Sequence, residues 1–251
     1  MYKIGDYVTR KKYNSDVLFV IKDIKNNKYI LSGVDLRLYA DAYEDDLILT
    51  IKTKKKENKN LTRKLDTNNY FYIPGIILHL DSDQEYLDRC LDYYKEHKIK
   101  CYGYIFNEKE YINNIDRLLK KHKPNILVIT GHDAYYKDKN KYRNSEHFIK
   151  VVDHVRKNYD NELIIISGAC QSDFINLIKV GSSYASSPAH INVHALDPAI
   201  IASFLALSDV NEVIKLDELL SMTTYGSDGY GGIITKGTMK IGTPRKDKNW
   251  I

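Results

Sequence analysis

The sequence predicts an α/β fold in which a mostly parallel sheet carries helices on both faces, preceded by a small β domain. From residue 70 onward, apolar runs of strand length alternate with segments whose apolar residues repeat at helical spacing. Residues 126–129 and 163–166 are apolar at every position, which is typical of parallel strands buried on both faces. Over residues 1–50, short strand-like runs follow one another with no helical segment between them.

Residues 1–50 are predicted to form a small barrel similar to SH3 domains. Strands are expected at 2–9, 17–22 and 28–31 and in a further stretch that ends at Thr50. The pair Asn26-Asn27 suits a hairpin turn between the second and third strands, because asparagine tolerates positive φ angles.

Residues 51–69 are expected to form an exposed basic linker between this domain and a peptidase-like domain over residues 70–251. The run contains few apolar residues, and its basic residues are Lys52, Lys54, Lys55, Lys56, Lys59, Arg63 and Lys64. A nucleic-acid surface is the sharper alternative, but the run lacks the interleaved aromatic residues on which bases stack. The net charge of +5 is mild, so we expect no nucleic-acid partner.

The elements of the larger domain follow from periodicity and from turn residues. A capping box formed by Ser82 and Glu85 is expected to start the first helix, and Asp197-Pro198 to start a late one. Residues 225–232 are expected to be a flexible loop and residues 233–241 a closing hairpin. The other predicted elements are strands at 70–80, 101–106, 126–130 and 163–166 and helices over 82–94, 111–119, 148–155 and 174–178.

Composition excludes several classes of protein. The three cysteines are an odd and sparse set, which argues against a disulfide framework in a reducing compartment, and their spacing is not that of a metal site. No run is long enough to span a membrane, and residues 1–6 lack the apolar stretch of a signal peptide. We therefore expect an intracellular protein with no membrane partner. The glycine-rich run 226–232 is too irregular for a phosphate loop, so no nucleotide cofactor is expected.

Two of the buried strands end in turns that carry reactive side chains, His132 and Cys170. Substrates of parallel α/β sheets bind beyond the carboxyl ends of the strands, and one crossover connection would make these two strands neighbours or near-neighbours. A thiol nucleophile and a general base delivered to one edge of a sheet form a cysteine-nucleophile site. The sequence therefore predicts an enzyme.

The turns around these residues suggest how the site would work. Backbone N–H groups at Cys170 and in the Gly131–Asp133 turn are expected to form the oxyanion hole. Gly168 allows a sharp turn before Cys170, and a helix capped by Ser172 or Asp173 would favour the thiolate.

The order of histidine and then cysteine on successive strands resembles the caspase-like cysteine peptidases. The second motif of that group matches as Ala169-Cys170, whereas Asp133 stands where those enzymes have glycine after the histidine. The glycine that usually contributes to the oxyanion hole is therefore absent after His132, and Gly131 is expected to take over part of its role.

A second resemblance covers almost the whole chain and is to the sporulation-specific YabG protease family. The segments that carry it are 131–135, 168–172, 184–188, 191–198, 231–233 and 241–244, together with Gly5-Asp6-Tyr7-Val8 near the start. It implies a cysteine peptidase of spore-forming bacteria that matures spore-coat and cortex-associated proteins, made in the mother cell and associated with the forming coat. It also implies cleavage after basic residues, preferentially arginine, with His132 and Cys170 as the catalytic dyad.

A preference for arginine requires a carboxylate in the S1 pocket. Asp133, Asp173, Asp197 and Asp228 are candidates because each lies close to a predicted site loop. Helix capping is the competing role for Asp173 and Asp197, and an exposed turn for Asp228. The choice among the four stays open. The basic linker contains the residues that such an enzyme would cut, which suggests self-processing.

Two other functions are compatible with the residues. One is a different Cys-His hydrolase, such as a glutamine-amidotransferase-like enzyme, in which the cysteine usually precedes the histidine. The other is a non-enzymatic module whose β domain and basic linker dock a protein or an RNA. Neither the oligomeric state nor the natural substrates follow from the sequence.

Overall fold

The computed structural model describes residues 1–51, 66–136, 138, 140–159 and 161–243. It divides the chain into two compact units, residues 1–59 and 60–251. The predicted basic linker runs from 51 to 69, and its charged run from Lys52 to Lys64 lies outside the described residues.

The first unit contains one antiparallel sheet of five strands in the order β4-β3-β2-β1-β5. Its strands are β1 (Tyr7–Arg10), β2 (Phe19–Lys25), β3 (Lys28–Gly33), β4 (Tyr39–Ala42) and β5 (Leu47–Leu49), with short 3-10 helices η1 (Lys11–Tyr13) and η2 (Glu44–Asp46). Asn26 and Asn27 connect β2 to β3 with φ angles of 49° and 62°, so the predicted hairpin turn is confirmed. Val8, Ile21 and Leu31 are fully buried at the centre of its core.

The expected barrel does not close. Within the described residues, β4 and β5 form the two edges of the sheet and each pairs with one neighbour, so the unit is an open sheet. Strand β4 was not predicted, because Ala40, Asp41 and Ala42 have low strand propensity. Its extended conformation depends on its pairing with β3.

The second unit is built on a six-stranded sheet in the order β14-β13-β12-β9-β7-β8. All neighbouring pairs are parallel except β13 and β14, which confirms the predicted mostly parallel sheet. Its strands are β7 (Ile77–Asp81), β8 (Cys101–Ile105), β9 (Ile126–Ile129), β12 (Ile164–Ser167), β13 (Tyr184–Ser186) and β14 (Tyr230–Gly232).

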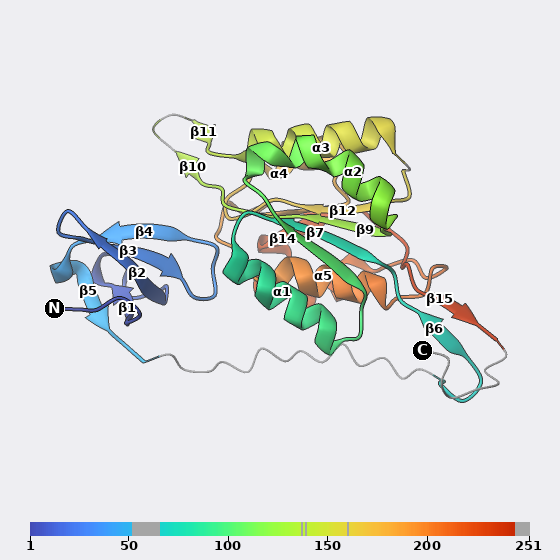
Figure 1. Cartoon of the computed structure of the whole chain (residues 1–251), viewed down its shortest axis with the longest axis horizontal. Coiled ribbons are helices and arrows are strands. Elements are labelled where there is room, and N and C mark those ends of the chain that lie inside the picture. The colour runs from blue at the N-terminus through green and yellow to red at the C-terminus, as the bar shows by residue number, and fades with distance from the viewer. Residues whose placement is uncertain (52–65, 137, 139, 160, 244–251) are drawn as a thin grey trace. The chain divides into compact units, whose positions relative to one another are not determined.

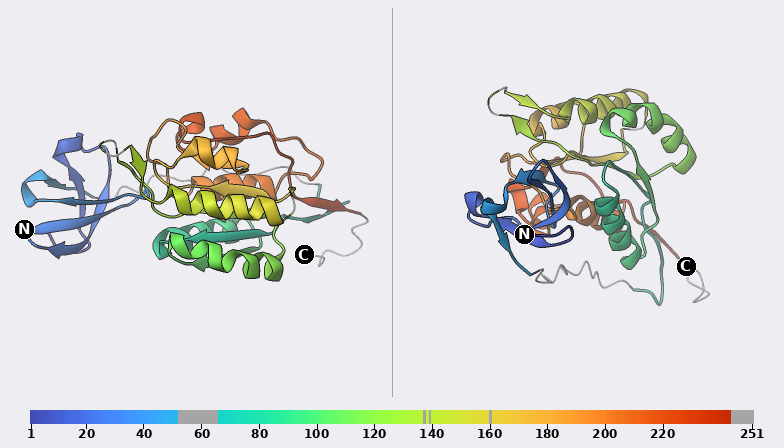
Figure 2. Two further views of the ribbon diagram at one scale, coloured as in Figure 1. Left: turned by 90° about the horizontal axis from the view of Figure 1, so that it is seen from above. Right: turned by 60° about the vertical axis from the view of Figure 1, so that its left-hand side comes forward.

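Helices cover both faces of this sheet (Figure 1). One face packs against α1 (Gln84–Glu96), α5 (Asp197–Ala206) and α6 (Leu216–Ser221), and the other against α2 (Tyr111–His122), α3 (Ser145–Asn158) and α4 (Phe174–Lys179). Figure 2 shows α2 and α3 side by side on the second face. Along β9, Ile126 and Val128 point to the first face and Leu127 and Ile129 to the second, which is the alternation that a strand buried on both faces requires.

The edges of the unit differ from the sequence prediction. The predicted strand 70–80 is split by Pro74 and Gly75 into β6 (Phe71–Ile73) and β7, because proline cannot donate to a strand ladder. β6 pairs with β15 (Lys240–Gly242) and not with the main sheet. The hairpin expected at 233–241 is therefore wrong, and part of the predicted loop 225–232 is the strand β14, preceded by η4 (Gly226–Asp228).

Among the described residues, no helix is both long enough and apolar enough to cross a membrane.

Replacing Phe148 by alanine should strongly destabilise the second unit. The side chain is fully buried between α3 and the sheet, with its ring 6.2 Å from that of Tyr111. Phe148→Ala removes this buried area and leaves a cavity, so the free energy of unfolding should fall by about 3–5 kcal/mol. Urea unfolding followed by circular dichroism at 222 nm reports on this unit, because the described α-helices all belong to it. A loss below about 1 kcal/mol, equal to that of the exposed variant Lys150→Ala, would contradict the packing.

Candidate active site

The two reactive turns lie side by side because β9 and β12 are hydrogen-bonded neighbours. Ile129 pairs with Ser167 in the parallel register, and the Gly168 N–H continues the ladder by donating to Ile129 O at 3.0 Å. His132 is the third residue after β9, and Cys170 is the third residue after β12. The topology therefore brings both predicted residues to one edge of the sheet, next to the point where the strand order reverses between β7 and β9.

The His132 imidazole is held by a carboxylate from a third strand. Its Nε2 lies 3.2 Å from Asp83 Oδ2, just beyond the end of β7. The other carboxylate oxygen of Asp83 caps helix α1, accepting hydrogen bonds from Glu85 N at 3.0 Å and Tyr86 N at 3.2 Å. Asp83 thus couples the start of α1 to the orientation of the His132 ring. The Tyr86 ring lies edge-on to the His132 ring, with 6.1 Å between their centroids.

The capping box predicted for α1 is wrong, because Asp83 and not Ser82 is the cap. The Ser82 hydroxyl instead donates to Glu108 Oε1 at 2.6 Å, and the same oxygen accepts the backbone N–H of His132 at 2.8 Å. A Cβ on Gly131 would lie 2.7 Å from that Glu108 oxygen, so glycine leaves room for the carboxylate. The His132 N–H is consequently engaged and does not serve the oxyanion hole expected in this turn.

A buried polar network lies beneath Asp83. Asp81 accepts the Asp83 N–H at 3.1 Å, and its other oxygen accepts the Thr130 hydroxyl at 2.8 Å. His79 is fully buried, with Nε2 2.8 Å from Thr130 Oγ1 and Nδ1 3.0 Å from the Tyr94 hydroxyl. These hydrogen bonds connect the ends of β7 and β9 and hold the backbone of Asp83 in place.

Asp133, the residue that replaces the expected glycine, organises the first turn. Its side chain accepts the N–H groups of Ala134 at 2.9 Å and Asn144 at 2.8 Å and the Ser172 hydroxyl at 3.0 Å. The Ser145 hydroxyl also donates to it. Because Ser172 lies two residues after Cys170, one carboxylate connects the histidine turn, α3 and the cysteine turn. Burial raises the pKa of Asp133, and these hydrogen bonds act in the opposite direction.

Cys170 lies in a tight turn and is covered. Gly168 has a φ of +103°, a conformation that glycine adopts without strain, and the Ala169 N–H donates to Ser172 Oγ at 2.8 Å. The thiol is 1% exposed and lies 3.8 Å from Val193 O. The thiol is therefore packed beneath the segment that leads into α5.

The helix predicted to follow Cys170 is present as α4. Helix α4 begins at Phe174, as predicted, and Asp173, one of the two expected caps, is its cap. Cys170 lies three residues before this cap, in the turn between β12 and α4, so the effect of the helix terminus on its thiolate stays a prediction.

The four candidate acids for the S1 pocket have different surroundings. Asp197 is fully buried and accepts the N–H and the hydroxyl of Thr224 at 2.9 and 3.0 Å, and burial raises its pKa. It is the first residue of α5 and does not act as its side-chain cap. Asp228 is exposed in η4. Asp173 caps α4 through Asn176 N at 3.2 Å and lines a cavity of about 520 Å³.

Within the described residues, no group of three or more histidine, cysteine, aspartate or glutamate side chains is arranged to hold a metal ion. Cys90 donates to Ala195 O at 3.6 Å from within the core, and Cys101 packs at its border, where burial raises the pKa of the thiol.

Comparison with known proteins identifies the family. The family model described as YabG peptidase U57 matches residues 3–66 and 48–244, and so spans both compact units. The chain belongs to this family. The Sporulation-specific protease YabG of Bacillus subtilis (strain 168) is 38% identical over 286 residues, which cover 98% of this chain and 99% of that protein.

Membership of the family confirms the predicted resemblance and the prediction of a peptidase, and the substrates of a peptidase are proteins. The amidotransferase-like and non-enzymatic alternatives receive no support from it.

Asp83 and Glu108 were not predicted to be site residues. Asp83 lies within the segment that was assigned to helix capping by Ser82 and Glu85. Glu108 lies 24 residues before His132, whose backbone N–H it binds. Nothing in the local sequence distinguishes either from an ordinary surface acid. The only available signal was position, because both follow the carboxyl ends of predicted strands of the sheet that carries His132.

The stability contributed by Asp133 should depend on pH. An acid whose pKa is raised on folding holds its proton more tightly in the folded state. Its contribution therefore falls as pH rises from the ordinary pKa of 3.8 through the folded value. Asp133→Asn removes this titration, so the variant should lose less stability than the wild type between about pH 4 and pH 7. Urea unfolding across this range provides the measurement, with Asp153→Asn as a control at a half-exposed acid. Parallel pH profiles for wild type and Asp133→Asn would contradict the raised pKa.

Proposed function

We propose that the protein is a cysteine endopeptidase in which Cys170 is the nucleophile and His132 the general acid and base. The observation that carries the proposal is the placement of these two residues. Each is the third residue after one of two hydrogen-bonded parallel strands, in a chain that belongs to a peptidase family. A thiol and an imidazole at the same sheet edge supply the two groups that amide hydrolysis through a covalent intermediate requires.

The reaction follows from these groups. The Cys170 sulfur attacks the carbonyl carbon of the scissile peptide bond, after its proton has passed to His132. The imidazolium then protonates the leaving amine as the carbon–nitrogen bond breaks, which leaves a thioester on Cys170. Water, deprotonated by His132, attacks the thioester and releases the acid product and the free thiol. We assign the oxyanion hole to the backbone N–H of Cys170, because the N–H groups of His132, Gly168 and Ala169 donate to Glu108, Ile129 O and Ser172 Oγ.

Asp83 acts as a positioning residue in this scheme. Its Oδ2 lies 3.2 Å from Nε2 of the ring and so fixes the orientation of the imidazole. A carboxylate also stabilises the imidazolium that forms during the reaction. The N-cap of α1 fixes the position of Asp83, so the orientation of His132 depends on the start of that helix.

The substrate must displace the segment that covers the thiol. Cys170 is 1% exposed beneath Val193, so a peptide carbonyl reaches the sulfur only when the chain around Val193 moves. We infer that substrate binding opens this segment.

The proposed substrates are spore-coat and cortex-associated proteins, cut after basic residues with a preference for arginine. Support comes from the relative of 38% identity, whose name places it in sporulation as a protease. The corresponding site of action is the mother cell and the forming coat. Self-processing within the basic run 52–64, which would separate the two units, belongs to the same proposal.

Removing either member of the dyad should abolish peptide cleavage. Cys170→Ala should lower kcat by at least about 10⁴-fold, because the covalent route is lost, and His132→Ala by about 10²–10⁴-fold. Cleavage of arginine-containing peptides, analysed by mass spectrometry, provides the measurement. Iodoacetamide labelling gives an independent readout: opening of the segment around Val193 should let Cys170 react faster than Cys90, which is buried in the core. Cleavage by Cys170→Ala at the wild-type rate would overturn the proposal.

The same incubation tests self-processing. Wild type and Cys170→Ala are held side by side without peptide, and fragments that begin within residues 52–64 are identified by mass. Equal fragmentation of the two proteins would exclude self-cleavage, because the variant lacks the nucleophile.

Asp83→Asn should lower kcat by roughly 10²-fold or more and leave KM nearly unchanged. Asparagine preserves the cap of α1, so stability should stay within about 0.5 kcal/mol of wild type, whereas Asp83→Ala loses the cap as well. The ¹⁵N chemical shifts of the His132 ring should move in Asp83→Asn, which a purely structural role would not cause. Unchanged kcat together with unchanged ring shifts would show that Asp83 does not position the histidine.

A further inference from the structure

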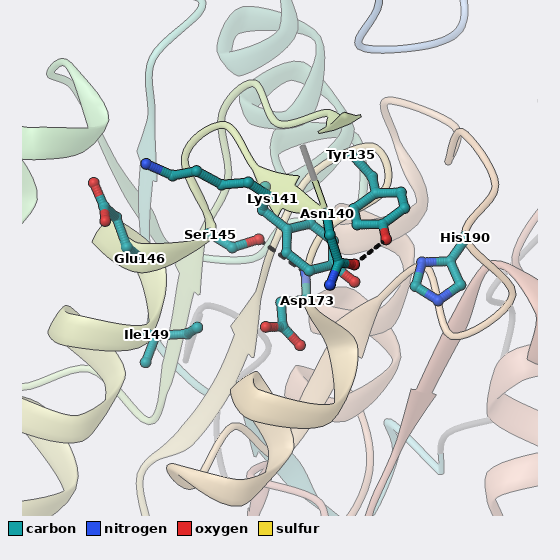
Figure 3. A pocket seen from close by; sticks show the side chains of 9 residues that line it. Tyr135, Asn140, Lys141, Ser145, Glu146, Ile149, Asp173 and His190 are labelled. Atoms are coloured by element: carbon teal, nitrogen blue, oxygen red, sulfur yellow. Dashed lines mark hydrogen bonds between the residues drawn. The ribbon is translucent and has the colours of Figure 1, made fainter. Parts of the chain in front are cut away.

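A cavity of about 520 Å³ opens beside the cysteine turn, where the hairpin of β10 (Tyr135–Tyr136) and β11 (Lys141–Tyr142) meets the start of α3. This volume falls within the range of about 300–1,000 Å³ that is usual for ligand-binding pockets. Figure 3 shows side chains from the hairpin, from α3 and from the loops after β12 and β13 around one space. The walls that matter here are Tyr135, Tyr142, Asp173 and His190.

The cavity has a negatively charged floor. The Asp173 carboxylate caps α4 by accepting hydrogen bonds from Asn176 N at 3.2 Å and Asn176 Nδ2 at 2.7 Å. The backbone N–H of Asp173 donates to Ser145 Oγ at 2.8 Å. The pKa of Tyr142 is raised, first by burial and next by the charge of Asp173, so the ring lies within the field of that carboxylate. Figure 3 shows the Lys141 side chain extended toward Glu146 and away from Asp173.

The upper part of the cavity is aromatic. The rings of Tyr135 and Tyr142 lie 5.0 Å apart at an interplanar angle of 46°. The His190 ring lies 5.8 Å from Tyr135 and 6.4 Å from Tyr142, and it stacks against Tyr142 at an interplanar angle of 21°. The Tyr135 hydroxyl donates to Asn140 Oδ1 at 2.5 Å, which holds that ring in place. Aromatic faces attract cations, and the planar guanidinium group stacks on them.

The cavity is joined directly to the nucleophile turn. Tyr135 is three residues after His132 and donates its N–H to Gln171 Oε1 at 3.3 Å, next to Cys170. Asp173 is three residues after Cys170, and Ser145 links it to the Asp133 carboxylate that spans both turns. A side chain that enters the cavity therefore belongs to a substrate segment within a few residues of the reacting carbonyl.

We propose that this cavity is the subsite for the arginine side chain of a protein substrate, with Asp173 as the carboxylate that pairs with the guanidinium and Tyr135 and Tyr142 as its stacking walls. The inference rests on the proposed peptidase function and selects one of the four acids. Asp133 and Asp197 accept hydrogen bonds inside the protein and are 5% and 0% exposed, and Asp228 lies in η4, outside the cavity.

Peptides that are identical except for one residue test the assignment. They carry arginine, lysine or citrulline, the neutral isostere of arginine, at the basic position. Wild type should prefer arginine to citrulline by about 10²-fold in kcat/KM, and Asp173→Asn should reduce that ratio by about 10- to 10²-fold. Asparagine is as good a helix cap as aspartate, so the variant should remain folded. Asp153→Asn makes the same change of charge on α3 outside the cavity and should leave the ratio unchanged.

Two variants of Tyr135 test the role of the aromatic walls. Tyr135→Phe keeps the ring and should retain most of the preference, whereas Tyr135→Leu should lower kcat/KM for the arginine peptide about 3- to 30-fold. An arginine-to-citrulline ratio that is unchanged in Asp173→Asn would overturn the subsite while peptide cleavage by Cys170 still stands.

A binding measurement separates failure of the subsite from failure of the peptidase proposal. N-acetylarginine amide is titrated into wild type and Asp173→Asn, and the His190 ring resonances are followed by NMR. Asp173-dependent shifts in a protein that cleaves no peptide would support the cation pocket and refute the peptidase mechanism. Shifts of equal size in both proteins would overturn the pocket.

Discussion

The parallel ladder between β9 and β12 is the constraint on which the site depends. Its register pairs Ile129 with Ser167, and the Gly168 N–H extends it by one more bond. Because each reactive residue is the third after its strand, a slip of the register by one residue would displace His132 and Cys170 relative to each other and would turn every buried side chain of β12 to the opposite face. The continuous apolar character of the two strands prevents such a slip only in combination with the helices that fill both faces.

Three carboxylates fix the positions of the atoms in these neighbouring turns. Asp83, Glu108 and Asp133 each come from a different element, and each binds atoms of the first turn. Asp133 also reaches Ser172, so the two turns share a carboxylate. Burying an acid is costly unless it is well hydrogen-bonded, and the number of donors around Asp133 meets that requirement. The departure from glycine after His132 therefore has a structural reason, because the side chain at this position connects the two halves of the site.

The alternation of strands and helices was predictable from residue 70 to Lys179, because apolar periodicity reports directly on burial in a three-layer fold. Prediction failed at the edges. β4 and β14 are short strands with weak propensity, and β15 pairs with β6 over a separation of more than 160 residues. Such pairings depend on which partner is near in space, which local sequence does not encode. The same reason explains the missed capping by Asp83, since Ser82 and Asp83 are both good caps and the contact of Ser82 with Glu108 decides between them.

By itself, the sequence determined the fold class, the family resemblance and the positions of His132 and Cys170, because buried strands and small-residue turns leave a strong local pattern. Only the tertiary structure decided what surrounds them: the carboxylate on the histidine ring, the cover over the thiol, and the cavity that sets Asp173 apart from three other acids. All four aspartates look alike in sequence. Their burial, their hydrogen-bond donors and their neighbours come from residues that are distant along the chain and meet only when the sheet has formed.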